Sequence, residues 1–332
     1  MKQTNTKKTL KTVPIIKPVS SAKSVPKAKT AELPTGLLAK LRYISLSSRP
    51  ISWLNTAFPF AAGYIIVSHH FSWLLLIGTL YFLIPYNLMM YGVNDVYDYE
   101  SDILNPRKGG LEGAKLAKSQ HRNILIAVAV TNVPFLVVLF SYGTNVAKLT
   151  LAAVVFMVLA YSLPKLRFKE RPLLDSFTSS CHFVGPLVYA LVLLGWQNHY
   201  WPYVVAFFCW GMASHAFGAV QDIISDRAGK ISSIGTVLGA RATVWFSLSL
   251  YAVACLILAT RGWAGLVVAI AGLLYIINIA PYWKLTDATS EIANVAWRRF
   301  IWLNLATGFV VTMVLIQVYR HSAPVCHLLL SA

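Results

Sequence analysis

Residues 73–93 read WLLLIGTLYFLIPYNLMMYGV, and residues 94–102 continue directly as NDVYDYESD. The first stretch contains no charged side chain and is long enough to cross a bilayer as a helix, which takes about 20 apolar residues. The second stretch places Asp95, Asp98 and Asp102 at the mouth of that helix. Ionisable side chains are costly next to a membrane and usually mark functional sites. The sequence therefore predicts a membrane helix that ends in a functional site.

The rest of the chain has the composition of a polytopic membrane protein. Its 332 residues are 57% hydrophobic and only 12% charged, about half the charged fraction of soluble domains. Nine apolar runs, each near the roughly 17–25 residues of a membrane helix, cover residues 51–68, 72–94, 122–142, 147–163, 174–195, 201–221, 242–260, 263–282 and 298–318. The runs are continuous, whereas the strands of membrane barrels are short and alternating. We therefore expect an all-α fold, a polytopic bundle of nine transmembrane helices.

Composition divides the chain into three segments. Residues 1–40 are basic and rich in Lys, Thr, Ser, Val and Pro, which is typical of a disordered tail. No continuous apolar segment follows the first lysines, so we do not expect a secretory signal peptide there. Residues 41–322 are expected to form the nine-helix membrane domain, and residues 323–332 a short C-terminal tail.

The basic residues fit membrane topology better than nucleic-acid binding, although the net charge is +17. If the N-terminus lies in the cytoplasm, every Lys and Arg except Lys148, Arg261 and Arg320 lies on the cytoplasmic side. This distribution follows the positive-inside rule. We therefore expect a multi-pass protein of the cytoplasmic membrane with its C-terminus outside, attracted to the anionic bilayer surface, and no nucleic-acid partner.

The acidic residues are distributed in the same one-sided way. Under this topology all twelve Asp and Glu residues of the chain lie on the cytoplasmic side. The positive-inside rule places little constraint on acids, so their distribution needs another cause. The simplest cause is a polar chamber, and we expect the active site near the cytoplasmic face.

Two clusters of aspartates predict a magnesium site. Asp95, Asp98 and Asp102 are spaced i, i+3 and i+7, and Asp222 and Asp226 are spaced i and i+4 after the sixth apolar run. Each set would share one face of a helix, where like charges repel unless a cation binds. Oxygen-only ligands select hard ions such as Mg²⁺, which binds one or two carboxylates together with substrate phosphates. We expect the two clusters to face each other and hold Mg²⁺ on a diphosphate. A solvated acidic helix end is the alternative for one cluster alone.

Polar and basic residues beside the clusters suit the same diphosphate, because cations are needed on the oxygens that the metal leaves free. The candidates lie directly before the first aspartate or in the loops after each cluster: Asn94, Arg107, Lys108, Arg227 and Lys230. Membrane topology alone is the alternative explanation for the four cations among them.

A third loop adds Tyr161 and Lys165, which are four residues apart at the end of an apolar run. On a helix both side chains could point into the chamber, the lysine toward the departing diphosphate and the tyrosine ring toward a developing cation. Topology signalling is again the alternative. Asn55, Tyr97 and His215 are weaker candidates for lining a substrate pocket, because intramembrane polar groups most often only join helices by hydrogen bonds.

NDVYDYESD, together with the second motif QDIISD, resembles the paired aspartate-rich motifs of the UbiA-type intramembrane prenyltransferases. The spacing of Tyr161 and Lys165 resembles the Tyr-x-x-x-Lys element on the fourth helix of that family. The resemblance covers about residues 45–320 and implies the family's nine-helix bundle. It also implies that the first three aspartates bind one Mg²⁺ and that the second pair binds another.

Four stretches are similar to the lycopene elongases of actinobacterial carotenoid synthesis: SSRPISWLNTAFPFAAGYI, FLIPYNLMMYGVNDVYDYESDILNPRKGG, YSLPKLRFKERPLLDSFTSS and WGMASHAFGAVQDIISDRAGKISSIGTVLGAR. This likeness implies that a dimethylallyl group moves from dimethylallyl diphosphate onto each end of lycopene or a similar polyene, toward fifty-carbon carotenoids. The lysine-rich head departs from the family. The alternative is a UbiA-type enzyme with another lipophilic or aromatic acceptor, such as a quinone, chlorophyll or haem precursor. A cation transporter is the rival from another class.

Overall fold

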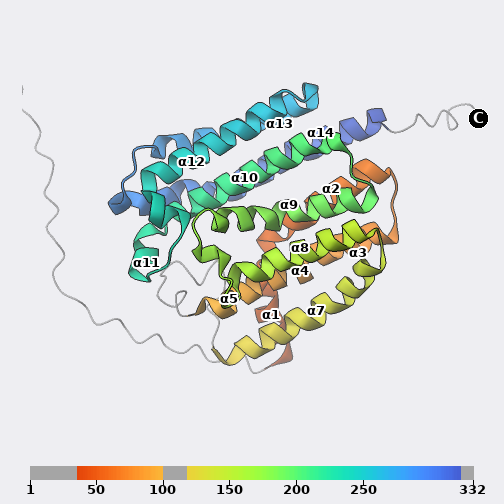
Figure 1. Cartoon of the computed structure of the whole chain (residues 1–332), viewed down its shortest axis with the longest axis horizontal. Coiled ribbons are helices and arrows are strands. Elements are labelled where there is room, and N and C mark those ends of the chain that lie inside the picture. The colour runs from red at the N-terminus through yellow and green to blue at the C-terminus, as the bar shows by residue number, and fades with distance from the viewer. Residues whose placement is uncertain (1–35, 100–117, 323–332) are drawn as a thin grey trace, which may run out of the picture.

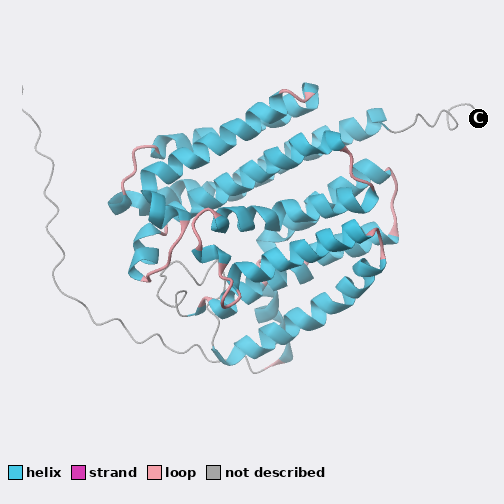
Figure 2. Ribbon diagram, viewed as in Figure 1, coloured by secondary structure: helices cyan, strands magenta, loops and turns pink. Residues whose placement is uncertain are grey.

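The computed structural model describes residues 36–99 and 118–322 of the chain, and within these ranges every regular element is a helix (Figures 1 and 2). In chain order the elements are α1 (Leu37–Ser47), η1 (Pro50–Ser52), α2 (Trp53–Ser68), α3 (Trp73–Leu83), α4 (Pro85–Asn87), η2 (Leu88–Gly92), α5 (Val93–Tyr97), η3 (Lys118–Gln120), α7 (His121–Ser141), α8 (Asn145–Ser162), η4 (Phe168–Glu170), α9 (Leu174–Leu194), η5 (Asn198–Tyr200), α10 (Trp201–Val220), α11 (Ile223–Ala228), α12 (Ile234–Ala259), α13 (Gly262–Ile279), η6 (Ala280–Tyr282), η7 (Asp287–Ala293) and α14 (Asn294–Ser322). The predicted site residues Asp102, Arg107 and Lys108 lie outside the described residues, as do both expected tails except residues 36–40.

Nine stretches within the described ranges are long and apolar enough to cross a membrane. They are Pro50–Ser68, Trp73–Tyr97, Lys118–Ser141, Asn145–Ser162, Leu174–Leu194, Asn198–Val220, Ile234–Ala259, Gly262–Tyr282 and Asp287–His321. The predicted all-α fold with nine spans is therefore confirmed. The seventh and ninth stretches begin at Ile234 and Asp287, earlier than the predicted residues 242 and 298. The expected domain boundary at residue 40 falls inside α1, which the sequence did not predict.

Among the described residues the bundle has two large apolar cores, one in each half of the chain, and a smaller cluster of Val184, Leu191 and Val204 where α9 meets α10. The larger side chains of the first core come from α2, α3, α4 and α9, and they are Phe60, Tyr81, Phe82, Tyr86 and Tyr189. Those of the second come from α10, α12, α13 and α14, and they are Phe217, Tyr251, Tyr275 and Phe300. Helix α9 packs against α2 and α8 on one side and against α10 on the other, so it joins the two halves (Figure 1).

The second span is not a regular helix where it approaches the first acidic motif. Helix α3 ends at Leu83, Pro85 begins the short α4, and residues 88–92 continue as the π-helix η2. Proline has no N–H to donate and clashes with the preceding turn, which explains the bend. Single turns of π-helix are frequent at functional sites, and this one is followed directly by α5 and the aspartates.

Side-chain amides satisfy the backbone that this bend frees. Asn87 donates from Nδ2 to the carbonyl oxygens of Phe82 at 2.8 Å and Leu83 at 3.1 Å. Asn132 of α7 donates to the carbonyl oxygen of Pro85 at 2.8 Å. No water is available in a bilayer core to bind such groups, so the protein has to supply their partners. The two asparagines therefore make the bend before the acidic motif possible.

The seventh span is also interrupted. Gly239 has a φ of 78° inside α12, a conformation that residues with a Cβ rarely adopt. The next residue restarts the helix, and the Ala240 N–H donates to Oδ1 of Asp287 at 2.7 Å. Residues 234–238 form a separate turn that packs against α11. The apolar run predicted from residue 242 therefore corresponds to the part of α12 after the break.

We expect Asn87→Leu to lower the free energy of unfolding by about 1–3 kcal/mol, because the carbonyl oxygen of Leu83 loses its side-chain donor and that of Phe82 keeps only Thr56 at 2.7 Å. Thermal or dodecyl-sulfate unfolding of the purified protein in detergent micelles measures this. Asn55→Leu is the matched control, since Asn55 is half-buried on α2 and makes no hydrogen bond among the described residues. Equal stability of the two variants would contradict this explanation of the bend.

Candidate active site

Helix α5 places the first two aspartates at the end of the second span. Asp95 lies on the helix, and Asp98 follows its last residue, with its N–H donating to the carbonyl oxygen of Asn94 at 2.9 Å. The residues are 2% and 7% exposed, respectively. Ser162, the last residue of α8, donates to Oδ1 of Asn94 at 3.0 Å. The two carboxylates are therefore buried within one helical turn of each other and tied to α8.

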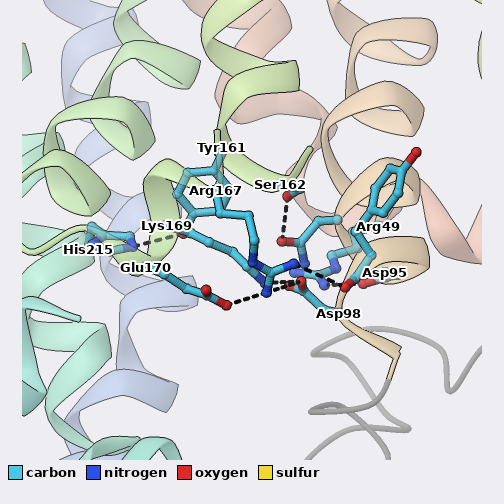
Figure 3. A network of polar contacts seen from close by, with 11 residues as sticks. Arg49, Asp95, Asp98, Tyr161, Ser162, Arg167, Lys169, Glu170 and His215 are labelled. Atoms are coloured by element: carbon cyan, nitrogen blue, oxygen red, sulfur yellow. Dashed lines mark hydrogen bonds and ion pairs between the residues drawn. The ribbon is translucent and has the colours of Figure 1, made fainter. Parts of the chain in front are cut away.

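Arg49, in the turn between α1 and η1, pairs with the first carboxylate. Its Nη2 lies 3.0 Å from Oδ1 of Asp95 (Figure 3). The guanidinium carbon also lies 4.3 Å from the centroid of the Tyr91 ring, an arrangement that attracts a cation to the aromatic face. Sequence analysis missed this residue, because an arginine before a first span is also an ordinary topology signal.

The η4 segment between α8 and α9 supplies the cations for the second carboxylate. Lys169 pairs through Nζ with Oδ1 of Asp98, and Nη2 of Arg167 lies 3.9 Å from the same oxygen (Figure 3). Arg167 also pairs with Glu170, and this hydrogen bond lowers the pKa of the Glu170 carboxyl. Removing the partner of a buried charge is strongly destabilising, so these ion pairs fix η4 against the end of α5.

Lys169 is within electrostatic reach of both aspartate clusters. Burial lowers the pKa of its amine to about 8, and the nearby carboxylates of Glu170, Asp226 and Asp95 oppose this shift. Its side chain is only 12% exposed. The lysine therefore pairs with the first cluster, and carboxylates of both clusters act on the charge of its amine.

The second cluster lies on α11, directly after the sixth span. The N–H of Asp226 donates to the carbonyl oxygen of Asp222 at 2.8 Å, so the two residues are one helical turn apart. Ser233, which caps α12, donates to Oδ2 of Asp226 at 3.3 Å. Both aspartates are half-buried.

The two cations after this cluster point elsewhere in the structure. Arg227 lies 2.7 Å from Oδ2 of Asp287 and donates to the carbonyl oxygen of Thr236 at 2.9 Å. It therefore ties α11 to α12 and η7. Lys230 is exposed with a φ of 56°, and its side chain has no partner among the described residues. Their predicted contact with a diphosphate stays a prediction.

The helical spacing predicted for Tyr161 and Lys165 is wrong. Helix α8 ends at Ser162, and Leu163 is extended. Lys165 then lies in the turn with a φ of 72°, and its side chain is exposed. The proline at position 164 explains this end, because the residue before a proline disfavours the helical conformation. Lys169, four residues further on, reaches the aspartates instead.

Tyr161 is held by a chain of hydrogen bonds across the bundle. Its hydroxyl lies 3.1 Å from Nε2 of His215 on α10 (Figure 3). Nδ1 of the same ring lies 3.0 Å from Oγ of Ser176 on α9. The ring of His182 packs edge-on against the tyrosine with centroids 5.2 Å apart. The structure therefore brings the candidates Tyr161 and His215 together and fixes the orientation of the tyrosine ring.

The fully buried Asp175 on α9 continues this network to the second half of the bundle. Its Oδ1 accepts from the N–H of Ser176 at 2.6 Å, and its Oδ2 accepts from the N–H of Ile234 at 2.7 Å. The carboxylate thus caps the N-terminus of α12, where a negative charge is favourable. The other two pocket candidates make few side-chain contacts. Asn55 makes no hydrogen bond among the described residues, and the backbone carbonyl oxygen of Tyr97 accepts from Arg167 at 3.4 Å.

The oxygen donors of the two clusters fit a hard divalent cation. Within residues 36–99 and 118–322, no three His, Cys, Asp or Glu side chains gather closely enough to hold a metal ion by themselves. Mg²⁺ does not need such a cage, because one or two carboxylates and the substrate phosphates usually suffice. Asp95 with Asp98, and Asp222 with Asp226, each offer one such pair of carboxylates. The residues present therefore fit Mg²⁺ bound together with a phosphorylated substrate.

Comparison with known proteins places this site in a family. The family model "UbiA prenyltransferase family" matches residues 56–305. Lycopene elongase/hydratase of Corynebacterium glutamicum is 48% identical over 286 residues, which are 86% of this chain and 100% of that protein. The C(50) beta-cyclic carotenoids biosynthesis protein LbtBC of a Dietzia species is 49% identical over 293 residues, which are 87% of this chain and 67% of that protein.

The fold agrees with that match. A UbiA homologue from Archaeoglobus fulgidus, solved bound to DMAPP and Mg²⁺, superposes with a TM-score of 0.59 at 18% identity and covers 81% of this chain and 99% of its own. At that identity the likeness shows the fold alone. Because the family model matches most of the chain and a relative is 48% identical over its whole length, the chain belongs to the UbiA prenyltransferase family.

Proposed function

We propose that this prenyltransferase moves a dimethylallyl group from dimethylallyl diphosphate onto the ends of lycopene or a similar polyene, in a Mg²⁺-dependent step of fifty-carbon carotenoid synthesis. The observation that carries the proposal is the buried pair Asp95 and Asp98, which Arg49 and Lys169 neutralise. The acceptor is supported by the relatives named for lycopene and C50 carotenoids. The donor and the metal are supported by the A. fulgidus homologue bound to DMAPP and Mg²⁺.

The aspartates have the role of metal ligands. Asp95 and Asp98, with Asp102 from the predicted motif, would hold one Mg²⁺, and Asp222 and Asp226 would hold the other. Bound Mg²⁺ would neutralise the charge that develops on the diphosphate as the allylic C–O bond breaks.

The cations have the role of diphosphate ligands. Arg49, Arg167 and Lys169 neutralise Asp95 and Asp98 in the structure, and they lie beside any diphosphate that these carboxylates bind through a metal. Charge-assisted hydrogen bonds to phosphate oxygens are among the strongest in proteins. Besides these three cations, the diphosphate ligands that the sequence predicts are kept in the proposal: Asn94, Arg107, Lys108, Lys165, Arg227 and Lys230.

Tyr161 has the role of stabilising the allylic cation through its ring face. His215 bonds the tyrosine hydroxyl, Ser176 bonds the other nitrogen of the His215 ring, and His182 packs against the tyrosine ring. The ring therefore cannot turn away when charge develops in front of it. The cation has to form in a water-poor chamber, since water would otherwise capture it.

The polyene acceptor needs no side-chain base, because its terminal double bond attacks the cation directly. A new C–C bond forms, and the resulting tertiary cation then loses a proton or takes up water. An apolar acceptor of this length can enter between helices from the lipid. We place the site at the cytoplasmic face of the cytoplasmic membrane, with the N-terminus inside and the C-terminus outside.

Expression in lycopene-producing cells is expected to convert lycopene into carotenoids longer by five carbons at each end, measured by mass spectrometry of the extracted pigments. Asp98→Asn should abolish the conversion, because it removes a metal ligand and leaves Lys169 unpaired. Glu291→Gln is the control, since Glu291 is an exposed carboxylate on η7. Unchanged lycopene with the intact protein would refute the acceptor, and normal conversion by Asp98→Asn would refute the role of the aspartates.

Removal of divalent metal is expected to stop prenyl transfer by the purified protein. EDTA should remove the activity, and Mg²⁺ added in excess should restore it, because the diphosphate leaves only with its charge neutralised. Labelled dimethylallyl diphosphate measures the rate in detergent micelles. Full activity in a preparation shown by elemental analysis to be free of metal would contradict the mechanism.

Lys169→Met is expected to raise the KM for dimethylallyl diphosphate by about tenfold or more, as expected for the loss of a charge-assisted hydrogen bond. Lys165→Met should raise it less, because Lys165 is exposed in the turn after α8. Steady-state kinetics of the two variants at saturating polyene measure the difference. A larger effect of Lys165→Met than of Lys169→Met would contradict this assignment and support Lys165 as the diphosphate ligand, as its spacing from Tyr161 predicted.

A further inference from the structure

The outer face of the α12–α13 hairpin carries an apolar groove of about 460 Å³. One side is formed by Trp245, Leu248, Ser249 and Ala252 of α12, and the other by Ile276 of α13 and Ala280 of η6. No carboxylate lines it. Small side chains along both helices, Ser249, Ala252 and Ala280, leave the space that larger residues would fill. The groove is separate from the aspartate clusters.

The residues along α12 form one continuous stripe. Arg241, Trp245, Leu248 and Ala252 follow each other at spacings of three or four residues, so they share one face of the helix. From Arg241 to Ala252 the helix rises by about 16 Å. That length is about half of the roughly 30 Å hydrocarbon core, so the groove has the depth of one leaflet.

Two cations lie at one end of the groove, around the indole ring of Trp283. The guanidinium carbon of Arg241 lies 5.9 Å from the ring centroid, and Nζ of Lys284 lies 4.5 Å from it. The rings of Trp245 and Trp283 meet edge-on at 6.0 Å. Both cations are exposed, and neither pairs with a carboxylate of residues 36–99 or 118–322. The order along the groove is therefore charge, indole rings and then aliphatic side chains.

We propose that this groove is a binding site for one anionic phospholipid of the surrounding leaflet. Its phosphate lies against Arg241 and Lys284, the two indoles lie at the level of the glycerol backbone, and an acyl chain lies along Leu248, Ala252 and Ile276. Tryptophan is enriched at the membrane interface because its ring is amphipathic. Basic residues beside clefts between membrane helices bind acidic lipid headgroups. Two cations without carboxylate partners favour a lipid with net negative charge over a zwitterionic one.

A chain of contacts links the proposed lipid site to the second aspartate cluster. Arg241 directly follows Ala240, whose N–H donates to Asp287, and Asp287 pairs with Arg227 of α11. The headgroup therefore binds at Arg241, the residue next to Ala240, whose contact with Asp287 restarts α12 after Gly239. The proposal does not depend on which substrate the enzyme uses.

Native mass spectrometry of the full-length purified protein tests the site. Phosphatidylglycerol and phosphatidylcholine with identical acyl chains are added separately, and the dissociation constant of the first bound lipid is measured. We expect phosphatidylglycerol to bind at least about fivefold more tightly than phosphatidylcholine. This factor corresponds to the binding free energy that one basic residue near an anionic lipid contributes. Arg241→Gln combined with Lys284→Gln should remove this preference. Ala252→Phe should weaken both lipids, because the ring fills the groove and leaves the cations in place.

Arg298→Gln combined with Arg299→Gln is the matched control. These exposed residues on α14 carry the same two charges outside the groove, so the preference should persist. Equal binding of the two lipids by the unchanged protein would overturn the proposal, as would equal loss of preference in both double variants. A protein dimer that Ala252→Phe disrupts, without any bound lipid, would assign the face to a second copy of the chain and also overturn it.

Discussion

Carboxylates buried at the end of a membrane helix have to be matched by positive charge, and this requirement organises the active end of the bundle. Asp95 and Asp98 are almost fully buried, and their cations come from segments far away in the chain. Arg49 lies in the turn before the first span, and Lys169 lies in the loop between the fourth and fifth spans. The ion pairs therefore fix these two connections against the acidic motif.

Two of the described spans have irregular backbone beside the acidic motifs. The second span passes through Pro85 and a π-helix before the first motif, and the seventh span breaks at Gly239 beside the second. Each break is satisfied by a polar side chain, Asn87 in one case and Asp287 in the other. In a membrane such departures from the helix are tolerated only where the protein supplies the lost hydrogen bonds.

Much of the fold could be predicted from the sequence, because the nine apolar runs record directly which segments cross the membrane. The ends of the helices were harder to predict from the sequence. Lys165 was expected to continue α8, but the chain leaves the helix at Ser162, before a proline, so Lys169 reaches the aspartates instead. The pairing of Arg49 with Asp95 depends on the packing of α1 and η1 and leaves no local pattern in the sequence.

The one-sided distribution of acids was also only partly a sign of the chamber. Asp175 and Asp287 both cap segments of α12 through backbone N–H groups, and Glu170 pairs with Arg167. These three carboxylates hold elements together, whereas the four described aspartates of the two motifs are the ones proposed as metal ligands. Burial and partners, which the sequence does not record, separate the two groups.

The most direct test of the account is an experimental structure of the protein with Mg²⁺ and a non-reactive thio analogue of dimethylallyl diphosphate. We expect one metal ion on Asp95 and Asp98, a second on Asp222 and Asp226, and the diphosphate between them with Lys169 on its oxygens. Metal bound away from these aspartates, or carboxylates still paired with Arg49 and Lys169 beside the analogue, would contradict the claim that the two acidic clusters form one diphosphate site.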